Sequence, residues 1–322
     1  MSVFVLMAAF SLGLPPGEAD WPAPRFVRGQ EIPFAGETVN VSDRPRLAFR
    51  NTNELNVRVF VLETSNDVTD LAILTAVTPK ANRAIAAATK TVSGEVAVES
   101  KPAARVEFYR IDAKGTVRKL TRPKTAPPFA FAADHATETL AGPALDGPTY
   151  SESGFLPPRK RDAEESGIRW SREADELWNG SRVIDLVGTQ ATKDYDHLAA
   201  AVAGWRRVDR FFLSPLDGLP RAYARRIEQR EGKSVIASVE VRLEMKPPVP
   251  PGSDADYRRL RQEAESASWF AAEWDRLHEP GKHTDAKAVT QLQARIARYL
   301  VEHPLGTSFR PAIEVLVKRD GE

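Results

Sequence analysis

The 322-residue chain has no cysteine, and it has only three methionines and five histidines. Without the sulfur atom, thiol catalysis, cysteine-bound zinc, iron–sulfur clusters and disulfide exchange are excluded. No charge of one sign dominates: residues 1–160 hold 19 basic and 17 acidic side chains, and the remainder hold 26 and 27. This balance indicates that the protein does not present a dedicated nucleic-acid surface.

Long apolar runs are also missing, apart from one short stretch near the start. Residues 3–14 are uncharged, and Pro15, Pro16 and a few small residues follow them. Twelve helical residues span about 18 Å, which is shorter than the roughly 30 Å hydrocarbon core of a membrane. We therefore expect a signal peptide over residues 1–19 and a secreted or periplasmic mature protein without a transmembrane span. No Lys or Arg precedes the run, so a buried strand or helix stays open as an alternative.

Apolar side chains recur at every second position between about residues 30 and 120. Leu55, Val57, Val59 and Val61 alternate with their neighbours, as the side chains of a half-buried strand do. Residues 106–111 and 116–120 flank a short loop containing Gly115, which is typical of a hairpin. The pattern predicts an antiparallel β domain over residues 20–122.

Proline marks the next boundary. Residues 123–165 are rich in proline, whose missing amide hydrogen disfavours both strands and helices, and we expect a connector there. A second β-meander is predicted over residues 166–246, where a Pro-x-Asp-Gly-x-Pro turn at residues 215–220 separates two strand patterns. This turn favours a strand over a helix at Tyr223.

The last segment, residues 253–322, has helical periodicity. Ser253 is a candidate N-cap for a first helix, and a second helix is expected over residues 285–302. A third helix around Ile313 competes with a closing strand. The whole pattern predicts an α+β fold, mainly antiparallel β, with two β-meanders or one curved sheet and a helical hairpin at the carboxyl end.

Five short phrases resemble a group of exported planctomycete proteins without assigned function, some of which precede a thioredoxin-like domain. The phrases are FVRG at residues 26–29, ELNVRV at 54–59, WRRVD at 205–209, LSPLDG at 213–218 and YLVEHP at 299–304. They lie in turns and strands, so the resemblance implies a shared fold. The chain departs from this group because it has no thioredoxin-like domain. Separately, the hairpin around the proline-flanked turn resembles the curved half-barrel of periplasmic lipoprotein carriers.

The sequence contains only weak matches to known metal-binding and catalytic motifs. His278 and His283 are five residues apart with Pro-Gly between them, so they would not share a helical face as the histidines of a zinc peptidase do. Asp194, Asp196 and His197 could ligate a cation, although such a run more often caps a helix, here one over residues 198–202. No nucleophile elbow, P-loop or dinucleotide fingerprint is present. We expect no catalytic residue, no metal and no cofactor.

The candidate ligand-binding residues are Trp178, Trp205, Arg207 and Phe211. They concentrate aromatic area near an arginine cluster, which is typical of a site for an apolar or lipid-like ligand, while core packing is the structural alternative. We expect a non-enzymatic secreted or periplasmic protein that binds a lipid-like ligand or an envelope protein partner. The alternatives are an envelope hydrolase with dispersed residues, including Asp196 or His197, and a helical scaffolding module that docks a partner.

Overall fold

The computed structural model describes Pro22 and residues 24–44, 47–65, 68–80, 102–112, 117–120, 168–173, 175–193, 195–199, 202–278, 285–303 and 309–318. The predicted signal peptide and proline-rich connector lie outside these residues. The described strands and helices are β1 (Glu31–Arg44), β2 (Leu47–Thr64), β3 (Val68–Pro79), β4 (Ala103–Asp112), β5 (Val117–Lys119), β6 (Arg169–Arg172), β7 (Glu176–Trp178), β8 (Ser181–Ala191), β9 (Ala203–Leu213), β10 (Pro220–Glu231), β11 (Ser234–Met245), α2 (Asp254–Leu277), α3 (Ala286–Glu302) and α4 (Arg310–Lys318), with a short 3-10 turn, η2 (Tyr195–His197).

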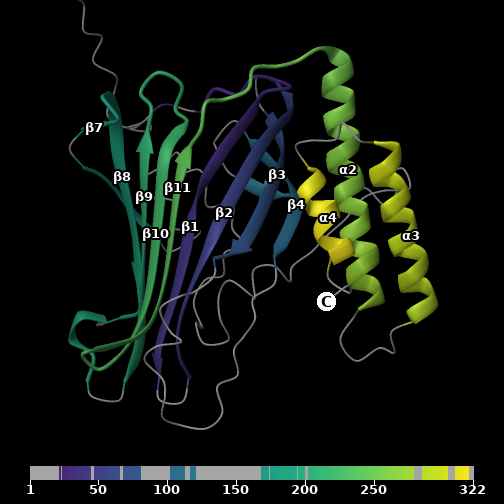
Figure 1. The fold of residues 1–322 in the computed structure, drawn as a ribbon. Helices are drawn as coiled ribbons and strands as arrows, with labels where there is room; N and C mark the ends of the chain where they lie inside the picture. The colour runs from purple at the N-terminus through teal and green to yellow at the C-terminus, as the bar shows by residue number, and fades with distance from the viewer. Residues whose placement is uncertain are drawn as a thin grey trace, which may run out of the picture.

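The strands form one open antiparallel sheet in the order β5-β4-β3-β2-β1-β11-β10-β9-β8-β6, with β7 paired to β8 (Figure 1). Each half is a meander, in which strands that follow one another along the chain pair, except that β6 and β7 both pair with β8. The halves are joined where β1 pairs with β11, from Phe34 opposite Met245 to Ser42 opposite Ala237. We call this pairing the seam. The two predicted meanders are therefore halves of a single sheet.

A glycine allows the close approach of the two strands at the seam. Gly36 lies opposite Leu243, and a Cβ atom added to Gly36 would lie 1.8 Å from the carbonyl oxygen of Arg242. That oxygen belongs to the backbone, so a side-chain rotation cannot relieve the overlap. A glycine within a strand often marks such an approach of another backbone.

The sheet has two apolar faces because successive side chains along a strand point in opposite directions. On β2, Phe60 and Leu62 belong to a buried cluster that includes residues of α2, α3 and α4. Val59 and Val61 belong to a second cluster, to which none of the described helices contributes. We call these the helix-covered face and the helix-free face of the sheet.

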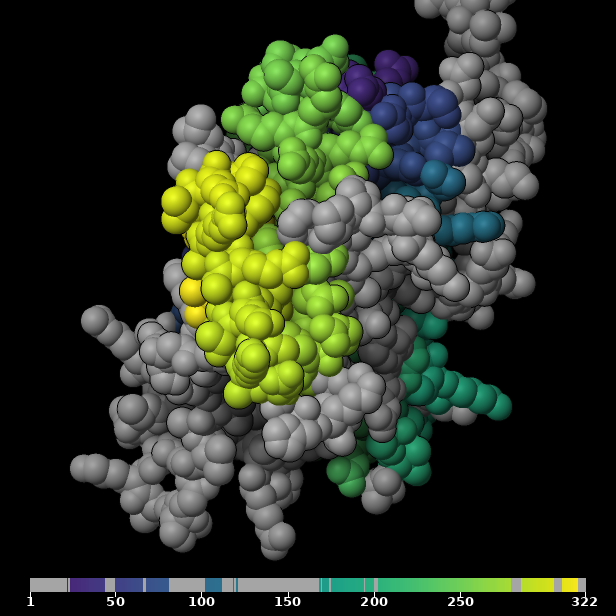
Figure 2. Space-filling model, turned by 90° about the vertical axis from the view of Figure 1, so that its right-hand side faces the viewer, coloured from purple at the N-terminus to yellow at the C-terminus, as the bar shows by residue number. Residues whose placement is uncertain are grey.

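The helices pack against the first meander on the helix-covered face. Figure 1 shows them on one side of the sheet beside β3 and β4, and Figure 2, which looks onto this side, shows α2 and α3 next to each other. Phe270, Ile296, Phe309 and Ile313 are each at most 1% exposed in the cluster between the helices and the sheet. Among the described residues, no helix combines the length and hydropathy that crossing a membrane requires.

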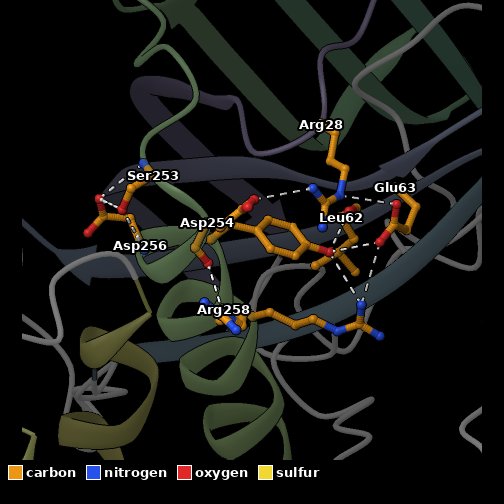
Figure 3. Close-up of polar contacts among 9 residues, drawn as sticks. Arg28, Leu62, Glu63, Ser253, Asp254, Asp256 and Arg258 are labelled. Atoms are coloured by element: carbon orange, nitrogen blue, oxygen red, sulfur yellow. Dashed lines mark hydrogen bonds and ion pairs between the residues drawn. The ribbon is translucent and has the colours of Figure 1, made fainter.

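Helix α2 starts at a capping box and a tyrosine anchor (Figure 3). The Ser253 hydroxyl accepts a hydrogen bond from the Asp256 amide, and the Asp256 carboxylate accepts one from the Ser253 amide. The Tyr257 hydroxyl, one residue later, donates to the Leu62 carbonyl oxygen at 2.7 Å. The Arg28 guanidinium lies 3.9 Å from the centroid of the Tyr257 ring. Three segments that are distant in sequence therefore meet at the start of α2.

A buried carboxylate connects α2 to α4. Glu263 is 3% exposed, and its Oε1 atom accepts a hydrogen bond from the Phe309 amide at 3.0 Å. Phe309 directly precedes α4, where the first amides of a helix have no partner within that helix. Glu263 therefore fixes where α4 begins in the helical layer.

The predicted fold class is confirmed. Tyr223 lies in a strand, Ser253 caps a helix, and Ile313 lies in a helix and not in a closing strand. The carboxyl end contains three described helices, one more than a hairpin. The helix expected over residues 198–202 is wrong: η2 ends at His197, and Leu198 and Ala199 are not helical.

Because Gly36 faces a backbone oxygen, Gly36→Ala is expected to lower the free energy of unfolding by about 1–3 kcal/mol, as overpacking does. Gly204→Ala is the matched control, since its added Cβ atom would meet only the side chains of Leu198 and Thr192. Urea unfolding followed by circular dichroism measures both losses. Equal losses for the two variants would contradict the role assigned to Gly36.

Candidate functional site

The apolar part of the helix-free face extends across both meanders and the seam. Its members are buried residues from β1 to β4, from β6 and from β8 to β11, with Ile168 and Leu219 beside them: Ile32, Phe34, Leu55, Val57, Val59, Val61, Leu71, Ile73, Val77, Tyr109, Ile111, Ile168, Trp170, Ile184, Leu186, Phe211, Leu213, Leu219, Tyr223, Val241 and Leu243. The same face becomes polar toward one end of the strands. Both parts are buried, so the face has an apolar half and a polar half.

Three residues of β1 form the polar row of this face. Thr38, Asn40 and Ser42 continue the alternation that places Ile32 and Phe34 in the apolar half, and they are 1%, 6% and 3% exposed. Their Oγ1, Oδ1 and Oγ atoms have no hydrogen-bond partner in the part of the chain that the structure describes. A buried polar group left in this state costs about 1–3 kcal/mol. Three buried oxygen atoms without a hydrogen-bond partner among the described residues therefore lie next to one another on β1.

A charged triad lies on the same face, on β9 and β10. Asp209 accepts hydrogen bonds from Arg207 Nη2 at 2.7 Å and from Arg225 Nε at 2.7 Å, and all three residues are at most 3% exposed. Arg225 is directly opposite Asp209 in the β9–β10 ladder, and Arg207 is two residues from Asp209 along β9. The triad is therefore a product of strand alternation and register.

The arginines determine how Asp209 titrates. Burial alone would raise the pKa of the Asp209 carboxyl, but the charges and hydrogen bonds of Arg225 and Arg207 outweigh burial and hold the pKa below its ordinary value. The carboxylate is therefore ionised at neutral pH and acts as the counterion of the two guanidinium groups.

The structure places three of the four predicted ligand-binding residues on one face of the sheet, although Trp205 and Phe211 are six residues, about 20 Å, apart along β9. Trp205, Arg207 and Phe211 alternate along β9 on the helix-free face, and Phe211 is 1% exposed. Trp178 lies on the other face, where its ring stacks on Phe212 with a centroid distance of 4.7 Å. Adjacent residues Phe211 and Phe212 point in opposite directions, so aromatic residues that are close in sequence do not form one site.

The three arginines of β9 also lie on opposite faces of the sheet. Arg206 and Arg210 point to the face opposite Arg207, where Arg206 pairs with Glu228 at 3.2 Å and Arg210 pairs with Asp185 at 2.6 Å. Among the three arginines of this stretch, Arg207 alone lies on the helix-free face.

The motifs considered for metal binding or hydrolysis do not assemble into a site. Asp196 and His197 are exposed, and the Asp196 carboxylate lies 3.7 Å from Arg206. His278 stacks on Trp274, and its Nδ1 atom is 2.8 Å from the Trp274 carbonyl oxygen. Asp194 and His283 lie outside the described residues. Within the described residues, no three His, Asp or Glu side chains are grouped so that they could hold a metal ion.

The sequence analysis did not predict the polar row or the pairing of Arg225 with Asp209. A signal for the row was available, since Thr38, Asn40 and Ser42 follow Ile32 and Phe34 with the same period of two. The pairing of Arg225 with Asp209 depends on the register of β9 and β10, which the periodicity of either strand alone does not fix.

Comparisons with known proteins give distant structural matches and no family. No protein-family model and no curated protein matches the chain. A putative outer membrane lipoprotein-sorting protein domain from Vibrio parahaemolyticus matches 71% of this chain and 89% of its own, at 9% identity and a TM-score of 0.21. LprF from Mycobacterium bovis matches 70% and 89%, at 10% identity and a TM-score of 0.22.

Lipovitellin is also similar, with 90% of this chain covered at 9% identity and a TM-score of 0.31, but this chain spans only 36% of that protein. The neighbours include a lipoprotein-sorting domain, the kind of protein whose half-barrel the proline-flanked hairpin resembles. The resemblance to planctomycete proteins has no support among them and stays a prediction. No functional argument follows from likenesses at such TM-scores.

Replacing Asp209 by Asn is expected to lower the free energy of unfolding at pH 7 by about 3–5 kcal/mol, because two buried guanidinium groups lose their counterion. The pKa of Asp209 is lowered in the folded state, so the wild type gains stability from this ionisation above the ordinary aspartate pKa. It loses that stability as the pH falls through the lowered pKa. The difference in the free energy of unfolding between the wild type and Asp209→Asn should therefore become smaller at acidic pH.

Urea unfolding at pH 7 and at several values below pH 4 tests this expectation, with Glu302→Gln as the control. Glu302 pairs with Arg298 on the surface, where its side chain is 51% exposed. Such a pair contributes about 0.5 kcal/mol or less. A loss for Asp209→Asn as small as that of the control would contradict the stabilising role of the triad.

Proposed function

We propose that this protein is a non-enzymatic binding protein for an apolar, lipid-like ligand that lies against the helix-free face of the sheet. The observation that carries the proposal is the apolar half of this face, which extends through the seam and includes no residue of the described helices. The helix-covered face already has a cover made by the chain itself. An extended apolar surface of this kind, to which no described helix contributes, is where we place the ligand.

Burial of a lipid chain against the apolar half would supply enough free energy for binding. Each buried methylene contributes about 0.8 kcal/mol, so ten methylenes contribute about 8 kcal/mol. This is the order of a micromolar Kd before the cost of association is subtracted. Trp205, Arg207 and Phe211 remain the proposed ligand-binding residues, and Trp178 is set aside because it faces the other way.

We place the protein outside the cytoplasm, secreted or periplasmic. The apolar run of residues 3–14 with its proline break supports export, and the absence of cysteine fits a protein that does not depend on thiol chemistry.

Native mass spectrometry of protein purified from an exporting host, compared with denatured protein from the same preparation, tests the proposal. We expect a discrete extra mass that is lost on denaturation and that fragments as a lipid-like molecule. For protein that has been delipidated and refolded, we expect 1-N-phenylnaphthylamine to bind with increased fluorescence. A bare mass together with no binding of this probe would overturn the proposal and favour docking of an envelope protein partner.

Two tryptophans on opposite faces provide a matched pair of variants. Trp205→Ala is expected to weaken binding of 1-N-phenylnaphthylamine by about two- to tenfold, because an aromatic contact contributes about 0.5–1.5 kcal/mol. Trp178→Ala removes the same side chain from the face opposite Trp205 and should leave the Kd unchanged. Fluorescence titration measures both values. Equal effects of the two variants would contradict the assignment of the ligand to the helix-free face.

A further inference from the structure

Exposed apolar side chains gather at one end of the sheet. Among the described residues, six large apolar side chains are exposed, and four of them lie at the end where β11 leads toward α2. They are Val27 ahead of β1, Leu177 on β7, Leu216 in the turn between β9 and β10, and Val249 after β11. Figure 1 shows β7, this turn and the end of β11 at the same end of the sheet. We call these four residues the apolar rim.

The rim residues project beyond the paired strands. Leu213, the last residue of β9, is opposite Ile184 on β8, and Leu216 lies in the turn beyond this level. The Arg25 amide donates to the Asp217 carbonyl oxygen at 2.7 Å, which connects the segment ahead of β1 to the same turn. From β8 to β1 the sheet has four strand spacings, so the rim extends over roughly 19 Å.

The rim adjoins the apolar half of the helix-free face. Leu213 and Leu219, on the two sides of the turn that carries Leu216, belong to that half. Ile32 also belongs to it, and it lies next to the bridge that β1 forms with Val249. Apolar side chains therefore continue from the buried face of the sheet to its exposed end.

The arginines beside the rim already have acidic partners. The pairs are Arg28 with Glu63 at 3.2 Å, Arg182 with Asp175 at 2.7 Å, and Arg221 with Asp217 at 2.7 Å. Because each of these cations has a counterion within the chain, attraction to an anionic surface contributes little at this end. The exposed groups that gain most from leaving water are the apolar side chains of the rim.

The spacing of the rim fits a lipid surface better than a protein partner. A specific protein interface buries about 800 Å² on each partner around a contiguous, well-packed core. The rim instead presents single side chains on separate segments, and fluid lipid can surround each of them individually. Apolar side chains of proteins that lie on a membrane enter it by about 5–10 Å, to the boundary between head groups and acyl chains.

We infer that the apolar rim docks this protein onto the surface of a lipid bilayer, where Leu177, Leu216 and Val249 enter the boundary between head groups and acyl chains. Burial of these side chains drives the attachment, so anionic lipids are not required. The inference goes beyond the proposed function and is independent of it, because docking needs no ligand bound to the sheet.

Fluorescent labels at the two ends of the sheet test the docking. The chain has no cysteine, so one introduced cysteine can carry a nitrobenzoxadiazole label at a chosen site. Val249→Cys places the label on the rim, and Val202→Cys, ahead of β9 at the opposite end of the sheet, is the matched control, since the two valines are 50% and 48% exposed. With phosphatidylcholine vesicles, we expect the emission to increase and shift to shorter wavelength for Val249→Cys only. Leu216→Cys should respond as Val249→Cys does.

Flotation with the same vesicles measures how much one rim residue contributes. Leu216→Gln is expected to lower the partition coefficient by about tenfold, because one leucine side chain no longer gains from burial in lipid. Val202→Gln should leave the partition coefficient unchanged. For the wild type, the coefficient should change by less than about twofold between about 0.1 and about 1 M NaCl, although the screening length falls from about 10 to about 3 Å.

Three results would overturn the inference. The first is equal responses of the labels at Val249→Cys and Val202→Cys. The second is binding only to vesicles that contain phosphatidylglycerol, lost at high salt, which indicates electrostatic attachment. The third is no response of any label and no flotation, which favours a protein partner at the rim. None of these results bears on the mass spectrometry or the 1-N-phenylnaphthylamine titration, so the proposed function is tested separately. If Val249→Cys does not fold, Leu216→Cys provides the same comparison.

Discussion

The seam between β1 and β11 is the pairing on which the rest of the structure depends. Each meander alone would be a five- or six-stranded ribbon with a short apolar surface, and only their union makes the helix-free face continuous from β4 to β6. The polar row lies on the seam strand β1, so its buried polar side chains lie where the two halves meet. Gly36 permits this contact by leaving room for the backbone of β11.

The two faces of the sheet differ in how their polar side chains are paired. On the face that carries Arg206 and Arg210, acidic partners such as Glu228 and Asp185 lie within ion-pair distance. On the helix-free face Asp209 accepts hydrogen bonds from Arg207 and Arg225, whereas the Thr38 Oγ1, Asn40 Oδ1 and Ser42 Oγ atoms have no partner among the described residues. Most buried polar groups in proteins have a hydrogen-bond partner, so the row on β1 is an exception to the usual pattern.

Much of the fold was predictable because its signals are local. Strand alternation, the proline-flanked turn and the Ser253 cap depend on residues that are close in sequence, and each was confirmed. The seam was not predictable, because periodicity shows that a strand exists and not which strand it pairs with. The candidate site was predicted in part for the same reason. Aromatic residues near position 211 were visible, but the opposite orientations of Trp178 and Trp205 depend on which face each strand presents.

The attachments of α2 have a consequence for how the molecule opens. Tyr257 binds the end of β2, and Glu263 binds the residue before α4, so the helices cannot leave the first meander without breaking buried hydrogen bonds together with the shared apolar cluster. That cluster contains no residue of the second meander. Amide hydrogens of the helices and of β2 to β4 are therefore expected to exchange with solvent as one cooperative unit, while those of β8 to β10 exchange through smaller openings that leave the helical layer in place.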